Sequence, residues 1–316
     1  MAIEEVDVAI IGGGPAGISA ARELQRLGLR RVVVLERERE AGGTVRHCGH
    51  RGFGMLDFGR VWTGPRYAER LRRVSRGLDV RPSTAVLALG TEGQLALSTP
   101  EGPREIRAER VLLATGIREA TRAARLVSGG RPFGILTTGA LQRFVYLEGR
   151  LPCRRPVVIG SELVAYSTIL TLRHAGVRPV ALLEEESQTA APFPVSHLAR
   201  LLFGVRTERS ARLTAIEGEA QVTAITIERQ GRLERLACDG VIFTGKWVPE
   251  ATLMRQHPAG VDPATAGPRV DHNLRTADPR IFAAGNVRYG VRSSGRCALE
   301  GRYAARAIAR DLMQTR

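Results

Sequence analysis

The segment Val6-Asp7-Val8-Ala9-Ile10-Ile11-Gly12-Gly13-Gly14-Pro15-Ala16-Gly17 determines how this chain begins to fold. Its apolar run leads into glycines at G-x-G-x-x-G spacing, which are Gly12, Gly14 and Gly17. Residues 18–27 carry apolar or small side chains at helical spacing, and Gly28 follows. The pattern predicts a strand, a tight turn and a helix whose free N–H groups face a diphosphate. Gly12 permits the turn, Gly14 leaves space for the diphosphate, and Gly17 lets the helix approach the strand.

An acidic residue follows where a dinucleotide-binding fold holds a ribose. Residues 31–35 predict a second strand, and Glu36 comes directly after it, about 20 residues beyond the last glycine. A carboxylate there can accept hydrogen bonds from both hydroxyls of an adenosine ribose. A buried strand with a glycine turn and no ligand is the simpler alternative, but all the parts of the motif fall in register. The expected cofactor contacts of this segment also include Pro15, Ala16 and Arg37.

The composition is that of a globular protein. The 316 residues suffice for two domains, and the chain is 43% hydrophobic and 25% charged. No apolar run is long enough to span a membrane, and the N-terminal segment lacks the features of a signal peptide. We therefore expect a cytoplasmic protein without a membrane span.

The charge is strongly positive. The formal net charge is +15, and it comes from arginine, since Lys246 is the only lysine. The arginines are scattered, whereas nucleic-acid binding prefers a concentrated basic face, so we expect no nucleic-acid partner. An acidic protein partner would make better use of this charge, because complementary fields speed association.

The cysteines predict neither a disulfide framework nor a zinc site. None of the four, Cys48, Cys153, Cys238 and Cys297, forms a C-x-x-C pair, so free thiols in a reducing compartment are the simplest interpretation. His47 and His50 flank Cys48, but no carboxylate or further ligand is close to them in the sequence. We therefore expect no metal.

The remainder of the first domain predicts one helix and several strands. The hairpin turn Gly90-Thr91-Glu92-Gly93 joins two of the strands, and a buried strand ends in Ala114-Thr115-Gly116, where Thr115 and Gly116 are expected cofactor contacts. The helix is expected at residues 67–74, and the strands at 85–89, 94–98, 105–108 and 111–116.

A second copy of this unit follows. Residues 156–160 repeat the opening strand, and residues 181–184 repeat the second strand with its acid at the same spacing. Residues 239–245 repeat the strand that ends in Ala-Thr-Gly. Strands expected between them lie at 212–216, 222–228 and 233–237.

The second glycine loop departs from the rule. Gly160 keeps the first glycine and Ala165 is tolerable at the third, but Glu162 replaces the middle one. Two like charges about 4 Å apart cost roughly 4 kcal/mol at an effective dielectric of about 20, so Glu162 would repel a diphosphate. Alternatively, Glu162 turns away and caps the helix. Glu184 could still hold a ribose and would favour NAD(H) over NADP, so this second site stays uncertain.

The C-terminal part resembles the last FAD motif of two-dinucleotide flavoproteins. Residues 275–286 end in Gly285 and Asn286, where Asn286 replaces the usual aspartate and can still bind the ribitol chain. A helix is expected at 297–312, with its N-terminus toward the flavin. We predict an α/β protein of two Rossmann-like, three-layer ββα nucleotide-binding domains, the second inserted in the first. The FAD-binding domain comprises 1–118 and 246–316, and the NAD(P)-binding-like domain 119–245.

The whole chain resembles small two-dinucleotide-fold flavoproteins of the size of thioredoxin reductase. Within them it is most similar to the FAD-containing A or alpha subunits of opine dehydrogenases, hydroxyproline and proline dehydrogenases, and hydrogen cyanide synthase. The segments that carry the resemblance are 42–50, 53–55 with 58–60, 134–140, 160–164, 246–249 and 297–301.

The resemblance implies an FAD-binding electron-transfer subunit of a heteromeric amine or amino-acid dehydrogenase. A partner flavoprotein, similar to D-amino-acid or sarcosine oxidases, would oxidise the substrate. Because the sequence ends at Arg316 without a cysteine-rich segment, we expect any iron–sulfur cluster on another subunit. Residues 41–50 would pass beside the flavin, with Gly43 and Thr44 as contacts and His47 or Cys48 near its reactive face.

Two other functions remain open. The chain could be a stand-alone NAD(P)H-dependent reductase of a ferredoxin or a quinone, although it has no redox dithiol and Glu162 argues against NAD(P)H. It could also bind a nucleotide only in order to build a complex.

Overall fold

The structure, a computed structural model, describes residues 3–191 and 204–315. The chain forms two compact units. The first comprises Met1–Arg46, Arg51–Arg118 and Val248–Arg316, and the second comprises His47–His50 and Glu119–Trp247. Strands β9 (Ile117–Glu119) and β19 (Trp247–Pro249) pair where the chain passes from one unit to the other.

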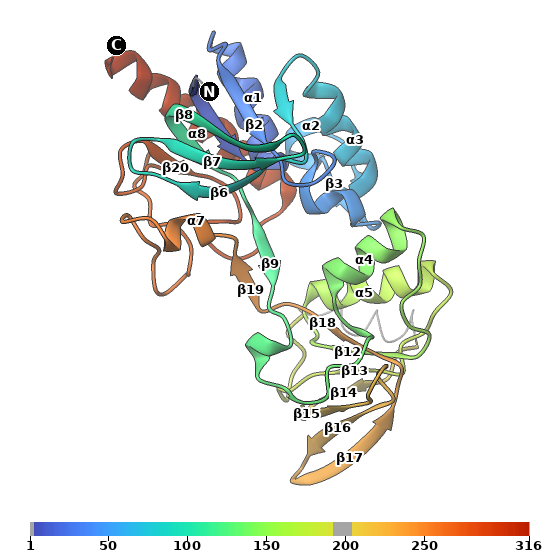
Figure 1. Cartoon of the computed structure of the whole chain (residues 1–316). Helices are drawn as coiled ribbons and strands as arrows, with labels where there is room; N and C mark the ends of the chain where they lie inside the picture. Colours follow the sequence, from blue (N-terminus) through green and yellow to red (C-terminus); the bar gives the residue numbers. More distant parts are fainter. Residues whose placement is uncertain (1–2, 192–203, 316) are drawn as a thin grey trace. The chain divides into compact units, whose positions relative to one another are not determined.

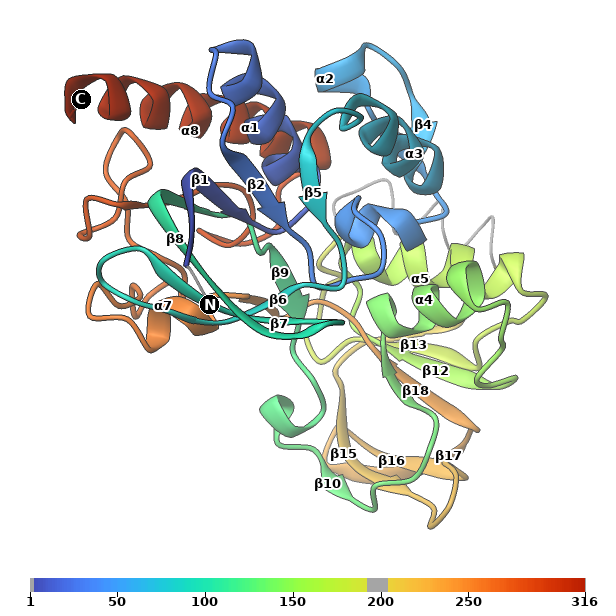
Figure 2. The same ribbon diagram turned by 45° about the horizontal axis from the view of Figure 1, so that its top comes forward.

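The first unit is built on a parallel sheet in the order β5-β2-β1-β8, with β20 beside β8 (Figures 1 and 2). In the middle strand, Ile11 lies opposite Leu35 on one side and Leu113 on the other. The apolar runs of β1, β2 and β20 and the last part of β8 are buried, as expected for a parallel sheet, whereas the edge strand β5 is partly exposed. Their bounds are β1 Glu4–Ile11, β2 Val32–Leu35, β5 Asp79–Arg81, β8 Gly102–Leu113 and β20 Ile281–Ala283.

Strand β8 corrects the sequence analysis, which expected separate strands at 105–108 and 111–116. A single strand runs through both and ends at Leu113. Its first part pairs antiparallel with β7 and its later part pairs parallel with β1. Arg110 stays inside the strand because its Nε donates to Asp311 Oδ2 at 2.5 Å. The meander strands β6 (Ala85–Leu89) and β7 (Gln94–Thr99) cover one face of the parallel sheet.

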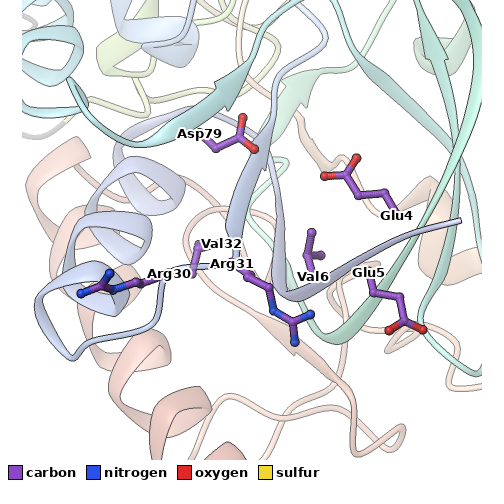
Figure 3. Close-up of a pocket in the computed structure, with 7 residues that line it drawn as sticks. All are labelled: Glu4, Glu5, Val6, Arg30, Arg31, Val32 and Asp79. Atoms are coloured by element: carbon purple, nitrogen blue, oxygen red, sulfur yellow. The ribbon is translucent and has the colours of Figure 1, made fainter.

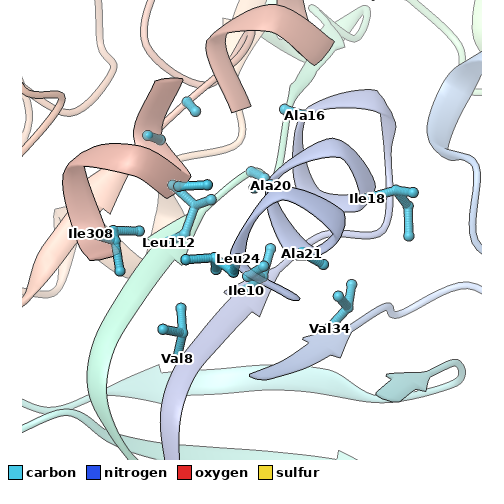
Figure 4. Close-up of a cluster of buried hydrophobic side chains, with 14 of the residues drawn as sticks. Val8, Ile10, Ala16, Ile18, Ala20, Ala21, Leu24, Val34, Leu112 and Ile308 are labelled. Atoms are coloured by element: carbon cyan, nitrogen blue, oxygen red, sulfur yellow. The ribbon is translucent and has the colours of Figure 1, made fainter. Parts of the chain in front are cut away.

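Helices α1 (Pro15–Arg26) and α8 (Ser294–Thr315) cover the other face. Figure 4 shows Ala21 and Leu24 of α1 on the side of the helix that faces the sheet, and Ile308 of α8 belongs to the same buried cluster. The expected helix at 297–312 is therefore longer at both ends. The remaining elements of this unit are β3 Arg51–Phe53, α2 Met55–Phe58, β4 Trp62–Thr63, α3 Gly64–Val74 and α7 Thr252–Arg255, and a 3-10 turn at Gly43–His47 begins in it.

The second unit has a parallel sheet in the order β14-β13-β12-β18-β11. Helices α4 (Thr138–Leu147) and α5 (Leu163–His174) pack on one face, and a four-stranded sheet packs on the other. The parallel strands are β11 Ile135–Thr137, β12 Pro156–Ile159, β13 Ala181–Leu183, β14 Thr207–Glu208 and β18 Gly240–Phe243. The covering sheet consists of β10 Ser128–Gly129, β15 Ala211–Glu217, β16 Ala224–Arg229 and β17 Arg232–Ala237, and a 3-10 turn lies at Ala123–Arg125.

The two units share a strand order but not a chain order. The edge strand next to β8 is β20, which comes last in the first unit and leads into α8. The edge strand next to β18 is β11, which comes early in the second unit and leads into α4. The three-layer arrangement is thus repeated with one strand–helix pair moved from the end of the unit to its beginning.

The strand at 239–245 repeats the strand that ends in Ala114-Thr115-Gly116, but the structure shifts the correspondence by one residue from that expected from the sequence. The Ala114 amide donates to Ile11 O at 2.9 Å, and the Thr244 amide donates to Ile159 O at 3.0 Å, so Thr244 corresponds to Ala114. Lys246, at φ +48°, therefore takes the left-handed place of Gly116, at φ +77°. Among the described residues, no helix is long and apolar enough to cross a membrane.

Close packing of α8 on α1 depends on Gly301. A Cβ added there would overlap the carbonyl oxygen of Ala16. Although alanine is the better helix former by about 1 kcal/mol, we expect Gly301→Ala to destabilise the protein by about 1–3 kcal/mol, because backbone cannot move away cheaply. Urea unfolding should record this loss, whereas Gly290→Ala, where no atom lies within 4 Å of the added Cβ, should be nearly neutral. An unchanged Gly301→Ala midpoint would contradict the packing argument.

Candidate functional site

The candidate site lies at the carboxyl end of β1, and Glu36 is its best-defined side chain. The Gly13 amide donates to Glu36 Oε2 at 2.9 Å, and the Glu38 amide donates to Oε1 at 2.9 Å. Glu36 is only 6% exposed, so these bonds fix its carboxylate beside the glycine turn. Each oxygen keeps a further lone pair, which suits a ribose diol. Gly13, which the sequence did not single out, therefore helps to hold the Glu36 carboxylate in place.

The three motif glycines serve three different needs. Gly12 has φ +112°, and a Cβ there would meet Ala114 backbone. A Cβ on Gly17 would overlap the carbonyl oxygen of Gly12, so only glycine lets α1 come this close to β1. Gly14 is different, because the nearest atom to an added Cβ is Gly43 Cα at 3.8 Å. The space above Gly14 is therefore open, as close approach of a diphosphate requires.

The start of α1 and the loop after Glu36 lie against Gly14. Pro15 is the first residue of α1, and no side chain caps the helix at Gly14, so its amides stay available to an anion. The Gly42 amide donates to Gly13 O at 2.8 Å, which holds the loop on the turn. Gly43 has φ +67°, and Thr44 after it is exposed.

Three other residues expected at the cofactor meet Glu250. Thr115 donates its hydroxyl to Glu250 O at 2.7 Å, and Gly116 O accepts from the Glu250 amide at 2.9 Å. Arg37 Nη1 lies 3.2 Å from Glu250 Oε2, so the two side chains form an ion pair at this edge of the sheet. These contacts join the ends of β2 and β8 to the segment after β19. A cofactor role for the three residues stays a prediction.

Gly285 and Asn286 follow β20 at the same end of the sheet. Gly285, at φ +80°, leaves an added Cβ only 3.1 Å from Ala16 Cβ. Asn286 Oδ1 accepts from the Arg292 amide at 2.8 Å and its Nδ2 donates to Arg292 O at 3.2 Å, so the side chain closes the loop before α8. One Nδ2 hydrogen remains for a ligand. The predicted ribitol contact of Asn286 stays a prediction.

Glu300 of α8 is a site residue that sequence reasoning missed. Its Oε2 accepts from the Gly285 amide at 2.5 Å, and its Oε1 accepts from Tyr289 Oη at 2.5 Å and from Arg288. The carboxylate so holds the turn that follows β20. The segment 297–301 was noted only for its resemblance, and no local pattern gives Glu300 this role.

A separate cavity of about 240 Å³ opens at the opposite ends of the strands (Figure 3). Glu4, Arg31 and Asp79 line it, and Asp7 and Arg81 pair with Arg31 and Glu4. Parallel sheets bind dinucleotides at their carboxyl ends, so this cavity at the amino ends is not the candidate site.

The second loop differs from the first at its middle position. Glu162 stands at the N-cap of α5, but its side chain makes no capping bond, so the capping alternative is wrong. Its carboxylate lies instead over the turn. Oε2 is 2.8 Å from a Cβ added to Gly160, and Oε1 is 2.6 Å from one added to Gly245.

The acid of the second unit is held like that of the first. The Glu186 amide donates to Glu184 Oε1 at 3.0 Å, as Glu38 does to Glu36. Ser161 Oγ donates to Glu184 Oε2, where Gly13 uses its amide. Glu184 is 8% exposed. The clamp around the acid is therefore preserved although the loop has changed.

His47 and Cys48 belong to the second unit and pack with α4. Cys48 Sγ lies 3.6 Å from Gln142 Oε1, and His47 Nε2 is 4.0 Å from a Cβ added to Gly139. Loss of hydration, with a smaller effect of the Glu119 carboxylate, raises the pKa of Cys48 to about 12. The thiol is therefore protonated at neutral pH and is a poor nucleophile. The predicted place of both residues at a flavin face stays a prediction.

Glu119 and Arg125 are two further residues that the sequence did not reveal. Glu119 Oε2 accepts from the Gly139 amide at 2.7 Å, and burial raises the pKa of this carboxyl group. Arg125 donates to Thr244 O and Gly245 O at 2.6 and 2.9 Å. Among residues 3–191 and 204–315, no group of three or more histidine, cysteine or acidic side chains could hold a metal.

Comparison with known proteins places these features in a family. A family model described as pyridine nucleotide-disulphide oxidoreductase matches residues 6–308. The A subunit of opine oxidase from Rhizobium meliloti is 25% identical over 98% of this chain and 63% of its own length. The HcnB subunit of hydrogen cyanide synthase from Pseudomonas protegens is 26% identical over 95% of this chain and 69% of its own length. The predicted relationship to these subunits is confirmed.

Two further matches bear on the length and the fold. The chain matches the alpha subunit of sarcosine oxidase from Rhizobium meliloti with 27% identity over 77% of its residues, but spans only 24% of that protein. Thioredoxin reductase of T. acidophilum superposes with a TM-score of 0.78 at 20% identity, covering 98% of this chain and 99% of that one. The predicted two-unit α/β fold is therefore confirmed as thioredoxin reductase-like.

The raised thiol pKa gives a labelling prediction. At pH 8 we expect Cys48 in the folded protein to react with a thiol reagent at least about tenfold more slowly than after unfolding, because little thiolate is present. Mass spectrometry of the labelled peptide measures the rate, and Glu119→Gln should accelerate it by removing a nearby negative charge. Because the thiol ionises near pH 9 in the unfolded chain and near 12 in the folded protein, Cys48 should destabilise the folded state as the pH rises from about 9 toward about 12. Rapid labelling of Cys48 at pH 8 in the folded protein would contradict this assignment.

Proposed function

The chain belongs to the pyridine nucleotide-disulphide oxidoreductase family, and from that premise we propose that it is the FAD-binding electron-transfer subunit of a heteromeric amine or amino-acid dehydrogenase. The family binds FAD, and the first unit offers the setting that FAD needs. The observation that carries the proposal is the contrast between the two loops: Gly14 leaves open space at the first, and Glu162 fills that space at the second.

Residues of the first unit would hold FAD in a defined order along the sheet edge. Glu36 would bind the adenosine ribose, and the amides at the start of α1 would face the diphosphate. Gly285 and Asn286 would meet the ribitol, in a turn that Glu300 holds. The N-terminus of α8 would supply a positive partial charge to the flavin edge. Bound FAD supplies the capacity to accept and release electrons, and the protein positions it.

The proposed role within a complex draws on the relatives. The matched opine oxidase, hydrogen cyanide synthase and sarcosine oxidase chains are each named as one subunit of a larger enzyme. We propose a partner subunit that resembles an FAD-dependent oxidase and oxidises the C–N bond of an opine, proline or hydroxyproline type of substrate. A small iron–sulfur subunit would be a second partner. The net charge of +15 favours partners with acidic faces.

A stand-alone NAD(P)H-dependent reductase of a ferredoxin or quinone is the second candidate. It is favoured by the preserved clamp of Glu184, which could hold the ribose of NADH. Mixing the purified yellow protein with NADH under anaerobic conditions distinguishes the two functions. We expect the visible flavin band to persist with NADH and to bleach with dithionite, which serves as the control that the flavin is reducible. Prompt bleaching by NADH would overturn the subunit proposal in favour of the reductase.

The role of Gly14 in FAD binding can be tested by copying the second loop into the first. We expect Gly14→Glu to be purified without flavin, because its carboxylate would occupy the space of the diphosphate and repel it. Gly14 has φ −80°, so the backbone accepts a side chain. Gly14→Ala places a smaller, uncharged group in the same space, since its Cβ meets only Gly43 Cα at 3.8 Å, and it should lose less flavin than Gly14→Glu. The flavin-to-protein absorbance ratio measures both, and full flavin content in Gly14→Glu would contradict the assignment.

A further inference from the structure

The crevice of the second unit contains a carboxylate where other dinucleotide folds accept a diphosphate. Glu162 Oε2 lies beside Gly160 at the end of β12, and its Oε1 lies beside Gly245 just after β18. These strands are neighbours in the parallel sheet. Their carboxyl ends form the place at which such folds bind a diphosphate. The side chain therefore bridges the ends of the two central strands.

The backbone around Glu162 has the form of a working glycine loop. Gly160 has φ +119°, close to the +112° of Gly12. The Gly160 amide donates to Leu183 O at 2.8 Å, and the Gly12 amide donates to Leu35 O at 2.9 Å. Glu162 itself has φ −72° and ψ 174°, which any residue adopts. The turn has therefore kept its shape, and at its middle position Glu162 carries a side chain where Gly14 has none.

Within the described part of the chain, no hydrogen bond accounts for the Oε1 atom of the Glu162 carboxylate. Among the described side chains, Glu162 Oε1 is one of five buried polar atoms without a hydrogen-bond partner. The nearby guanidinium of Arg125 binds the carbonyl oxygens of Thr244 and Gly245, and lies 5.0 Å from the ring centroid of Phe243. The positive charge of Arg125 attracts Glu162 through space. Its hydrogen bonds go to the two backbone carbonyls, so they do not hold the Glu162 carboxylate in place.

We propose that Glu162 is a resident anion that closes the dinucleotide crevice of the second unit, and that its side chain is the residue that decides whether this unit accepts an ADP-containing dinucleotide. Its bulk takes the space of the diphosphate, and its charge repels one. The acid expected to bind the ribose, Glu184, and the glycine turn keep the arrangement that dinucleotide binding requires. Removal of this one side chain is then sufficient to restore binding.

The inference does not need the electron-transfer role of the chain, and it is tested by binding and not by turnover. Calorimetry with ADP-ribose on FAD-saturated protein reports the second crevice, because FAD occupies the first. ADP-ribose contains the ribose and the diphosphate but carries no redox group, so the result is independent of flavin reduction by NADH. The variants are Glu162→Gly, Glu162→Gln and, as a control, Glu219→Gly at an exposed turn of the same unit.

We expect Glu162→Gly to bind ADP-ribose at least about tenfold more tightly than the wild type, a gain of about 1.4 kcal/mol. Glu162→Gln, which keeps the volume and loses the charge, should gain less, and Glu219→Gly should match the wild type. Glycine is acceptable at an N-cap, so the thermal midpoint of Glu162→Gly should remain close to that of the wild type and exclude misfolding. The proposal is overturned if folded Glu162→Gly binds no better than the wild type, or if the wild type already binds as tightly.

Discussion

The whole arrangement depends on three places where backbone meets backbone with no side chain between. Gly12 lies against the carbonyl of Ala114, Gly17 against that of Gly12, and Gly301 of α8 against that of Ala16. Together they bring the first turn of α1 to the carboxyl end of β1 and bring α8 against α1. The amides of α1 are then presented at one point of the sheet edge, where a diphosphate can use them. A Cβ at Gly12 or Gly17 would force the β1–α1 turn open, and a Cβ at Gly301 would separate α8 from α1.

The second unit keeps the sheet and loses part of this arrangement. Ala165 stands where Gly17 stands in the first unit, and it is fully buried although it has a Cβ. The order of the parallel strands is the same in both units, but the edge strand and its helix precede the other parallel strands in the second unit and follow them in the first. The layered architecture therefore depends on the order of the parallel strands. Whether the carboxyl edge of each sheet has space for a ligand depends on a few glycines.

The sequence predicted what lies close together in the chain. The glycine turn and the acid after the second strand follow from short-range patterns, and the acid lies beside the turn as expected. The internal repeat was also recognised, although its Ala-Thr-Gly strand was placed one residue away. The sequence did not predict contacts between distant segments, such as Glu300 with Gly285 or Arg125 with Thr244 and Gly245. Strand β8 was divided wrongly, and the contacts of Arg110 within it include Asp311 and Thr315, both distant in the sequence. No local pattern carries such partners.

The comparison of the two acids changes how a ribose-binding carboxylate should be interpreted. Glu36 and Glu184 each accept an amide from two residues ahead and a second bond from the glycine turn. Each acid therefore ties its turn to the end of the second strand whether or not a ribose is present. This structural task is sufficient reason for an acid to remain in a unit that binds no dinucleotide. The middle position of the loop, Gly14 or Glu162, consequently distinguishes the two units, whereas the acid that follows it does not.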